Sequence, residues 1–189
     1  KKILCILLLL LTGCSSKTSM IEIQKHVYVE KEFKDSWLET NEFGDSYIKE
    51  ELQGGYHYHF DQQFLEIFFN TGGKIELYNY SIKKNDLIIS GEMIPPKTIR
   101  LVHPHLDNVT SEGVIIHELG HYFDEKHQFS SSKQFTELYK KYRTLFNQKT
   151  KKEYFAECFK EYVGGHQEKV KPFHSYMKTI TQKIRQKNK

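Results

Sequence analysis

Hydrophobic and polar residues change their spacing partway along this chain, from the alternation typical of strands to the three-to-four-residue repeat typical of helices. Alternating or continuous apolar runs predict strands at 26–30, 74–82, 87–90 and 98–103. A first helix is predicted from Asp61 to Asn70, and residues 31–55 carry mixed signals. After residue 109 only helical spacing is found, at 110–126, 132–147, 151–164 and 173–186. Strands first and helices after predict an α+β fold, with a small mixed sheet packed on a mostly helical C-terminal half.

Composition limits the size and the partners of the protein. With 189 residues and 38% hydrophobic content, the chain can build one sizeable core, so we expect one domain and a monomer. The 28 basic and 24 acidic residues leave a net charge of +4, and no basic stripe is interleaved with aromatic residues. A nucleic-acid partner is therefore not expected.

The N-terminus has the pattern of an export signal. The apolar run from Ile3 to Leu11 follows two lysines and is far shorter than the ~20 residues that cross a bilayer. Leu11-Thr12-Gly13-Cys14 resembles a bacterial lipobox, in which Cys14 would carry the lipid after cleavage; a plain secretory signal is the alternative. We expect a lipoprotein signal peptide at 1–13, a polar tether at 14–25 and the domain at 26–189, anchored to the extracellular face of the cell membrane. Cys158 is then the only other mature cysteine, which excludes an internal disulfide.

The segment from Gly113 to His127, GVIIHELGHYFDEKH, holds the first candidate chemistry. On a helix, His117 and His121 lie about 40° apart and one turn apart, so both imidazoles can reach one ion. Glu118 lies about 100° round from His117, where its carboxylate can reach a water beside that ion. This is the arrangement of a zinc hydrolase, in which a carboxylate takes a proton from the attacking water. Gly120 lies on the same side and leaves room for another element to approach.

A catalytic zinc needs a third protein ligand, and the segment KEYFAECFKEYVGG supplies two candidates. Glu153 and Glu157 lie one turn apart on an otherwise apolar predicted helix, where carboxylates should face a cation. Helix geometry does not rank one above the other. The competing interpretation is a surface helix with incidental histidines. The pairs His57/His59 and His103/His105 lack a nearby acid or cysteine, so we expect one Zn²⁺ per chain.

The segments HELGHYFD and EYFAECF resemble the corresponding motifs of the anthrax lethal factor catalytic domain and of the secreted Pro-Pro endopeptidases, over roughly residues 60–180. The resemblance implies a zincin-like metallopeptidase domain. It implies zinc ligands at His117, His121 and Glu153, with Glu118 as general base and acid. It also implies an extended peptide or protein substrate, bound along an edge strand that matches 97–103.

The same resemblance adds residues around the ligands and raises one difficulty. Glu157 and Asp124 would orient ligand side chains from outside the metal. The family has a tyrosine seven residues before the ligand glutamate, whose hydroxyl stabilises the oxyanion, but here that residue is Phe146, which also fits an apolar stripe. Either Tyr142 or Tyr139 substitutes, or an oxyanion donor is missing.

The sequence thus favours a membrane-anchored zinc metalloendopeptidase. Two other functions stay open: a catalytically weak or inactive zinc-binding lipoprotein that binds a protein partner, and a protein that scavenges or senses zinc. A fourth protein ligand would favour the former over the enzyme, whereas an open coordination position beside a groove would favour the enzyme.

Overall fold

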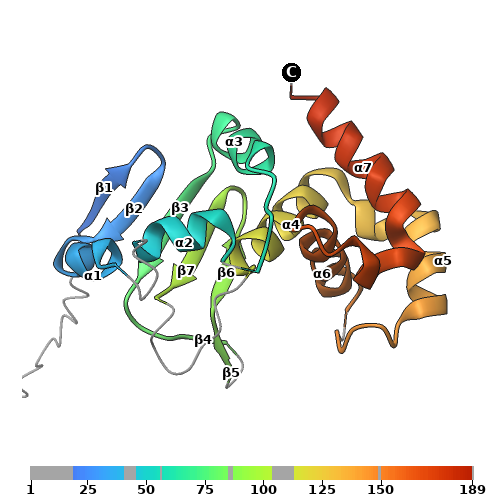
Figure 1. Ribbon diagram of the computed structural model, residues 1–189, viewed down its shortest axis with the longest axis horizontal. Coiled ribbons are helices and arrows are strands. Elements are labelled where there is room, and N and C mark those ends of the chain that lie inside the picture. Colours follow the sequence, from blue (N-terminus) through green and yellow to red (C-terminus); the bar gives the residue numbers. More distant parts are fainter. Residues whose placement is uncertain are drawn as a thin grey trace, which may run out of the picture.

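The computed structural model describes residues 19–40, 46–55, 57–84, 87–103, 113–148 and 150–188. Strands occupy the first half of this described part and long helices the second (Figure 1), so the predicted α+β fold is confirmed. The predicted signal peptide and the predicted lipidation site Cys14 lie outside the described part of the chain. His105 also lies outside it. Among the described residues, no helix is both long enough and apolar enough to cross a bilayer.

The main sheet has five strands in the order β1-β2-β3-β7-β6. Its strands are β1 (Met20–Gln24), β2 (Val27–Glu30), β3 (Lys74–Tyr78), β7 (Thr98–Val102) and β6 (Gly91–Ile94). The three central strands run parallel, and each outer strand pairs antiparallel with its neighbour. A separate antiparallel pair is formed by β4 (Ile82–Lys84) and β5 (Leu87–Ile89). The prediction of a small mixed sheet is therefore correct.

Two sequence predictions about this sheet are wrong. Residues 20–24 do not belong to a tether, because they form β1 and pair with β2. The alternation that places Ile21 and Ile23 against the core is present in the sequence, within a segment whose polar composition is typical of a linker. The segment 97–103 is not an edge strand either. It contains β7, which lies between β3 and β6, so that β6 is the edge.

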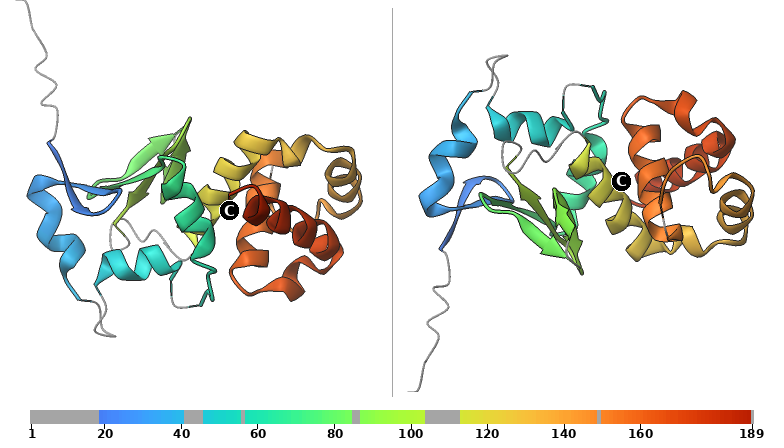
Figure 2. Two further views of the ribbon diagram at one scale, coloured as in Figure 1. Left: turned by 90° about the horizontal axis from the view of Figure 1, so that it is seen from above. Right: turned by 90° about the horizontal axis from the view of Figure 1, so that it is seen from below.

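The helices fall into a short group around the sheet and a longer group after it. The first group is α1 (Lys34–Leu38), α2 (Tyr47–Gln53) and α3 (Gln63–Asn70), with a 3₁₀ turn η1 (Lys31–Phe33). The second group is α4 (Val114–His127), α5 (Lys133–Tyr142), α6 (Lys151–Val163) and α7 (His174–Gln186), with 3₁₀ segments η2 (Phe129–Ser131) and η3 (Gln167–Phe173). All four late helices were predicted, although α5 ends at Tyr142 rather than near residue 147. In all the views α4 lies between the sheet and the C-terminal helices (Figures 1 and 2).

The core is continuous across α4, which buries apolar side chains on both sides. Phe64 of α3, Phe123 of α4 and Phe159 of α6 pack edge to face or tilted, with ring centroids 5.3–5.9 Å apart. Such aromatic pairs contribute about 0.5–1.5 kcal/mol beyond their buried area. The packing of α4 on α6 therefore sets how the side chains of these two helices face each other.

The closest approach of α4 and α6 is at Gly120. A Cβ at this position would lie 2.9 Å from Cα and 3.2 Å from the carbonyl oxygen of Ala156. Only glycine fits there without moving a backbone. The close approach that the sequence predicted for Gly120 is confirmed, and the approaching element is the helix that carries Glu153 and Glu157.

Candidate metal centre

His117 and His121 lie one turn apart on α4 and turn toward the same side. Their Nε2 atoms are 3.1 Å apart, and their rings meet edge to face with centroids 4.8 Å apart. The opposite side of the helix is held in the core by Ile115, Ile116 and Leu119, none of which is exposed. Burial of that apolar side fixes the rotation of α4 and so aims both imidazoles outward from the core.

Glu153 reaches the two histidines from the first turn of α6. The helix begins at a cap in which the Thr150 hydroxyl accepts the Glu153 backbone N–H at 3.2 Å. Oε2 of Glu153 lies 3.3 Å from His117 Nε2 and 3.2 Å from His121 Nε2. Among the described residues, His117, His121 and Glu153 form the one group of three such side chains whose donor atoms could hold a metal ion.

The spacing of these three donor atoms fits a small tetrahedral cation. Bonds of 2.0–2.1 Å from a tetrahedral ion place its ligand atoms about 3.3–3.4 Å apart. The observed separations of 3.1, 3.2 and 3.3 Å are close to that edge. Two imidazole nitrogens and one carboxylate oxygen are also a donor set that suits zinc, and they leave a fourth position for a non-protein ligand.

Glu157 makes a different contact, to the other ring nitrogen of His117. Its Oε2 lies 3.2 Å from Nδ1, and its Oε1 lies 2.7 Å from Nζ of Lys160. This contact fixes the orientation of the His117 ring and leaves Nε2 facing Glu153. The structure therefore distinguishes the two carboxylates that helix geometry could not rank. Glu153 contributes an oxygen to the donor cluster, whereas Glu157 contacts the opposite ring nitrogen of the donor His117.

Charge in the cluster favours a bound cation. Burial alone would lower the pKa of His117, but hydrogen bonds to Glu153 and Glu157 and the charge of Glu118 outweigh it and raise that pKa to about 9. Hydrogen bonds from His117 and His121 hold the pKa of Glu153 well below its usual range. A site that draws a proton onto an imidazole in this way also attracts a metal ion in its place.

Glu118 lies beside the cluster and is almost completely buried. Desolvation raises the pKa of its carboxyl group, and a hydrogen bond from the Met93 backbone N–H partly opposes that shift. Glu118 and His117 also line a cavity of about 340 Å³ between the start of α4 and the segment Ile88–Gly91. The base predicted from the sequence thus borders both the donor cluster and an adjoining cavity.

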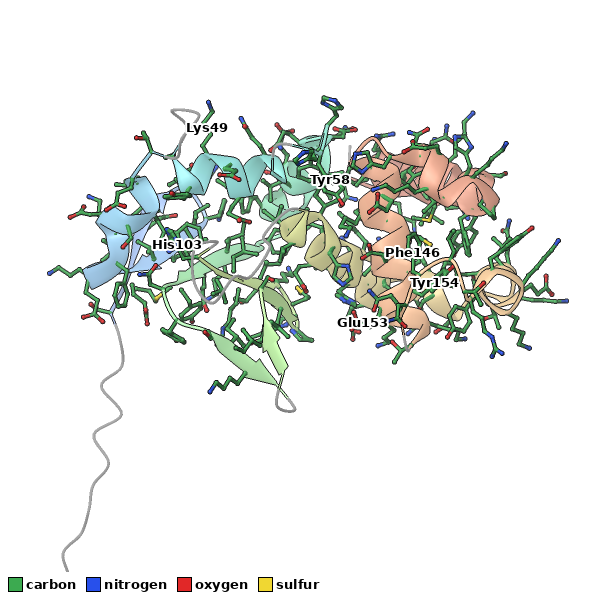
Figure 3. All side chains as sticks on the ribbon, turned by 60° about the horizontal axis from the view of Figure 1, so that its bottom comes forward. Lys49, Tyr58, His103, Phe146, Glu153 and Tyr154 are labelled. Atoms are coloured by element: carbon green, nitrogen blue, oxygen red, sulfur yellow. The ribbon has the colours of Figure 1, made fainter. Side chains whose placement is uncertain are left out.

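The tyrosines proposed as oxyanion donors lie elsewhere. Tyr139 packs on Tyr154 with centroids 5.1 Å apart, and Tyr142 packs on Phe173 at 6.1 Å. Phe146 also packs edge to face on Tyr154, with ring centroids 5.3 Å apart, and both residues are labelled in the helical half in Figure 3. The Tyr154 hydroxyl donates to the Tyr142 carbonyl at 2.5 Å. Within the described part of the chain, none of these residues forms a side-chain hydrogen bond or a ring contact with the donor cluster, so the structure shows Phe146 in core packing.

For Asp124, expected to orient a ligand, the side-chain contacts among the described residues are to Ser130 and not to a ligand histidine. Its two carboxylate oxygens accept from the backbone N–H and the hydroxyl of Ser130, both at 2.6 Å. Asp124 thus fixes the turn after α4. His103 is likewise structural, since its Nε2 lies 3.2 Å from the Ser36 carbonyl and its ring meets Trp37 edge to face.

Two contributors to the site were missed from the sequence. Lys160 follows Glu157 by three residues and Glu153 by seven, so the helical repeat places all three on one face, and this signal could have identified it. Met93 contributes only a backbone N–H to Glu118. Its side chain carries no signal for that contact, which depends on where β6 lies.

Comparison with known proteins supports the fold. No protein-family model and no curated protein matches the sequence. A solved structure that is similar is that of the Pro-Pro endopeptidase PPEP-2 from Paenibacillus alvei. The two chains share 15% sequence identity. The match covers 64% of this chain and 84% of the PPEP-2 chain, with a TM-score of 0.51. At this identity the likeness shows a shared fold, that of a small five-stranded sheet with a helical C-terminal half.

Proposed function

We propose that the protein is a zinc-dependent metalloendopeptidase that hydrolyses peptide bonds of an extracellular polypeptide. The observation that carries the proposal is the triangle of donor atoms from His117, His121 and Glu153, with edges of 3.1–3.3 Å, beside the buried carboxylate of Glu118. The fold shared with a peptidase supports the same class of reaction at a coarser level.

His117, His121 and Glu153 would hold the zinc ion. When bound, zinc would lower the pKa of a coordinated water to about 7 and polarise the substrate carbonyl. Glu118 would accept a proton from the attacking water and then deliver it to the leaving amine. Desolvation that raises the pKa of Glu118 suits both steps, because the carboxyl group then holds the proton more tightly between them. Glu157 and Lys160 keep the His117 ring oriented throughout.

The edge strand β6 is the proposed binding strand for an extended peptide substrate. The Ser90 carbonyl accepts a hydrogen bond from the Val102 backbone N–H. In an antiparallel pair, hydrogen-bonded and non-hydrogen-bonded residue pairs alternate. The register from this pair therefore makes Gly91 and Met93 turn their backbone groups away from β7. The outward Met93 N–H is the group that holds Glu118. The remaining outward groups of β6 are available to pair with an extended peptide, which would bring its backbone past the donor cluster.

The adjoining cavity of about 340 Å³ is the proposed site for one substrate side chain. Its lining combines apolar side chains with groups of the metal centre: Ile88, Ile89 and Val114 with His117, Glu118 and Lys160. Such a lining suits an uncharged side chain, since the Lys160 ammonium is already neutralised by Glu157 at 2.7 Å. Attachment to the outer face of the membrane through Cys14 is part of the proposal and rests on the sequence alone.

The test is cleavage of a diverse peptide library by the purified chain, with and without a chelator. We expect chelation to abolish cleavage and added zinc to restore it. Glu118→Gln should bind zinc as the wild type does but lose about 10²–10⁴-fold in kcat/KM. His121→Ala should lose both zinc and cleavage. Cleavage that survives chelation, or that Glu118→Gln retains, would overturn the mechanism.

One observation favours a second function, a zinc-binding lipoprotein of little or no catalytic activity that binds a protein partner. The described tyrosines nearest in sequence to the family position, Tyr139 and Tyr142, pack on the core of the helical half. Loss of one oxyanion donor costs about 10²–10³-fold in rate. Stoichiometric zinc binding with no library cleavage, together with zinc-dependent retention of a protein partner, would select this second function.

A further inference from the structure

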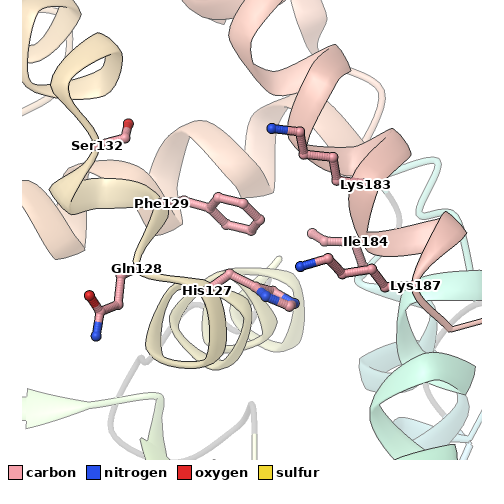
Figure 4. Close-up of a pocket in the computed structure, with 7 residues that line it drawn as sticks. All are labelled: His127, Gln128, Phe129, Ser132, Lys183, Ile184 and Lys187. Carbon is pink, nitrogen blue, oxygen red and sulfur yellow. The ribbon is translucent and has the colours of Figure 1, made fainter.

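A second cavity, of about 290 Å³, lies between the end of α4 and the last turns of α7. Its lining residues are His127, Gln128, Phe129, Ser132, Lys183, Ile184 and Lys187, drawn in Figure 4. None of them belongs to the metal centre, and none carries a carboxylate. The cavity is therefore a separate feature with an excess of positive charge.

Two lysines of α7 supply this charge. Lys183 and Lys187 are four residues apart, so their side chains lie on one face of the helix. In Figure 4 both extend from α7 toward the segment 127–132, the Lys187 ammonium toward His127 and the Lys183 ammonium toward the side of Ser132. Like charges at this spacing destabilise a helix by about 0.2–0.5 kcal/mol. Positive charge near a helix C-terminus is favourable, but it does not account for two ammonium groups turned toward one cavity.

Several cations of the helical half contact carboxylates. Arg185, in the same turn of α7, contacts Asp61 at 2.5 Å, and Lys169 contacts Glu161 at 3.1 Å. Within the part of the chain that the structure describes, neither Lys183 nor Lys187 has an acidic partner. Both lysines are exposed residues at the edge of the cavity, and a bound anion would supply a counter-charge to their ammonium groups.

His127 adds a polar group to the same cavity. Its Nε2 is buried and has no hydrogen-bond partner among the described residues. Burial and the charges of Lys187 and Lys126 lower the pKa of His127, so the ring is neutral and carries one N–H donor. Buried polar atoms without partners are uncommon in native proteins, and a ligand oxygen is one way to satisfy them.

The wall that carries His127 is rigidly built. Gln128 closes α4 in the left-handed conformation with φ 55°, and its backbone N–H donates to the Asp124 carbonyl at 2.6 Å. The Asp124 carboxylate holds Ser130 by two further bonds of 2.6 Å. The turn that faces the two lysines is thus fixed before any ligand arrives.

We propose that this cavity binds a phosphate group, either of a small phosphate ester or of a lipid headgroup. Two ammonium groups match the charge of a phosphate monoester, and phosphate oxygens accept strong charge-assisted hydrogen bonds. The apolar ring of Phe129 and side chain of Ile184 leave space for the carbon atoms attached to the phosphate. The site is independent of the metal centre and of the proposed peptidase activity.

The test follows the His127 ring by NMR while inorganic phosphate or glycerol phosphate is added, with chloride at matched ionic strength as the reference anion. It is run on the full chain, both metal-free and zinc-loaded with free zinc removed, because phosphate could also reach the metal centre. The variant is Lys183→Gln/Lys187→Gln. The matched control is Lys171→Gln/Lys178→Gln, which removes the same charge from exposed positions outside the cavity.

We expect phosphate to shift the His127 signals of the wild type and the control in both metal states, and the double variant in the cavity to weaken binding by about ten-fold or more. Vesicles of phosphatidylglycerol, compared with phosphatidylcholine, distinguish the two sources. If the protein is retained on the vesicles through Lys183 and Lys187 but does not respond to the small phosphates, the ligand is a lipid headgroup. If it responds to the small phosphates but is not retained on the vesicles, the ligand is a small phosphate ester. The proposal is overturned if chloride acts as phosphate does, if the cavity variant responds like the wild type, or if neither phosphates nor vesicles bind.

Discussion

Replacement of Gly120 by alanine tests whether the metal centre depends on the close packing of α4 on α6. The new Cβ would lie 2.9 Å from Cα of Ala156, whereas carbon atoms pack best about 3.5–4.0 Å apart. The neighbour is backbone, so the helices must separate by roughly 0.6–1.1 Å. Metal–ligand distances tolerate only about 0.2 Å. Because Ala156 lies between Glu153 and Glu157 on α6, the separation moves both carboxylates away from His117.

The expected effects on stability and on metal affinity differ in size. Overpacking costs about 1–3 kcal/mol, and alanine regains about 1 kcal/mol of helix propensity over glycine, so the metal-free protein should lose roughly 0–2 kcal/mol. Zinc affinity should fall by about 10–100-fold. At excess zinc this would remove about 1.4–2.7 kcal/mol of the stabilisation that bound zinc would provide.

The assay is urea unfolding followed by the fluorescence of the single, buried Trp37, with chelator and with excess zinc. Lys126→Ala, at an exposed position of the same helix, is the control and should leave both curves nearly unchanged. If Gly120→Ala keeps the full zinc-dependent increase in stability, the spacing of α4 and α6 does not position Glu153, and the reasoning fails.

Two further predictions concern charged groups. Lys160→Met should lower zinc affinity about ten-fold without unfolding the protein, because Glu157 loses its 2.7 Å partner and holds His117 less firmly. Equilibrium zinc titration measures this, with Lys152→Met as the control. Equal affinities of the two variants would contradict the prediction. Glu76→Gln should destabilise the sheet by about 1–2 kcal/mol at neutral pH, because Glu76 accepts from Lys74 and Tyr78. Burial raises the pKa of Glu76, but these bonds outweigh it and lower the pKa overall. The loss of stability in the variant should therefore be constant above the unfolded-state pKa of about 4.5. It should vanish as pH falls through the folded-state pKa. Urea midpoints from pH 3 to 7 measure it, and a difference that grows toward low pH would refute the assignment.

The part of the site that could be predicted from the sequence is the part that helix geometry determines. His117 and His121 are neighbours because they are four residues apart, and Gly120 marks the contact between helices for the same local reason. The glutamates of α6 stand out because carboxylates are rare in so apolar a segment. These relations need no knowledge of where the rest of the chain lies.

The parts that could not be predicted depend on pairing between distant segments. The strand at 20–24 was taken for a tether because its alternation is short and lies beside polar residues, and only its pairing with β2 makes it part of the sheet. The prediction of an edge strand at 97–103 rests on the family resemblance, which does not show how the strands of this chain pair. The hairpin through Pro95 and Pro96 adds β6 outside it, and a strand of four half-buried residues has no hydrophobic pattern that reveals this position.

The three glutamates of the site show why residue type alone does not assign a role. Glu153 accepts from two imidazoles, and Glu157 accepts from one imidazole and a lysine, so hydrogen bonds lower the pKa of each carboxyl group. Burial of Glu118 outweighs the charges of His117 and His121 and the hydrogen bond from the Met93 backbone, so its pKa moves in the opposite direction. Carboxylates that stay ionised suit the holding of a cation, whereas one whose pKa is raised suits proton transfer. The different pKa shifts of the three carboxyl groups are therefore set by the neighbours that α4, α6 and β6 bring to each of them, and burial is what distinguishes Glu118, the proposed base.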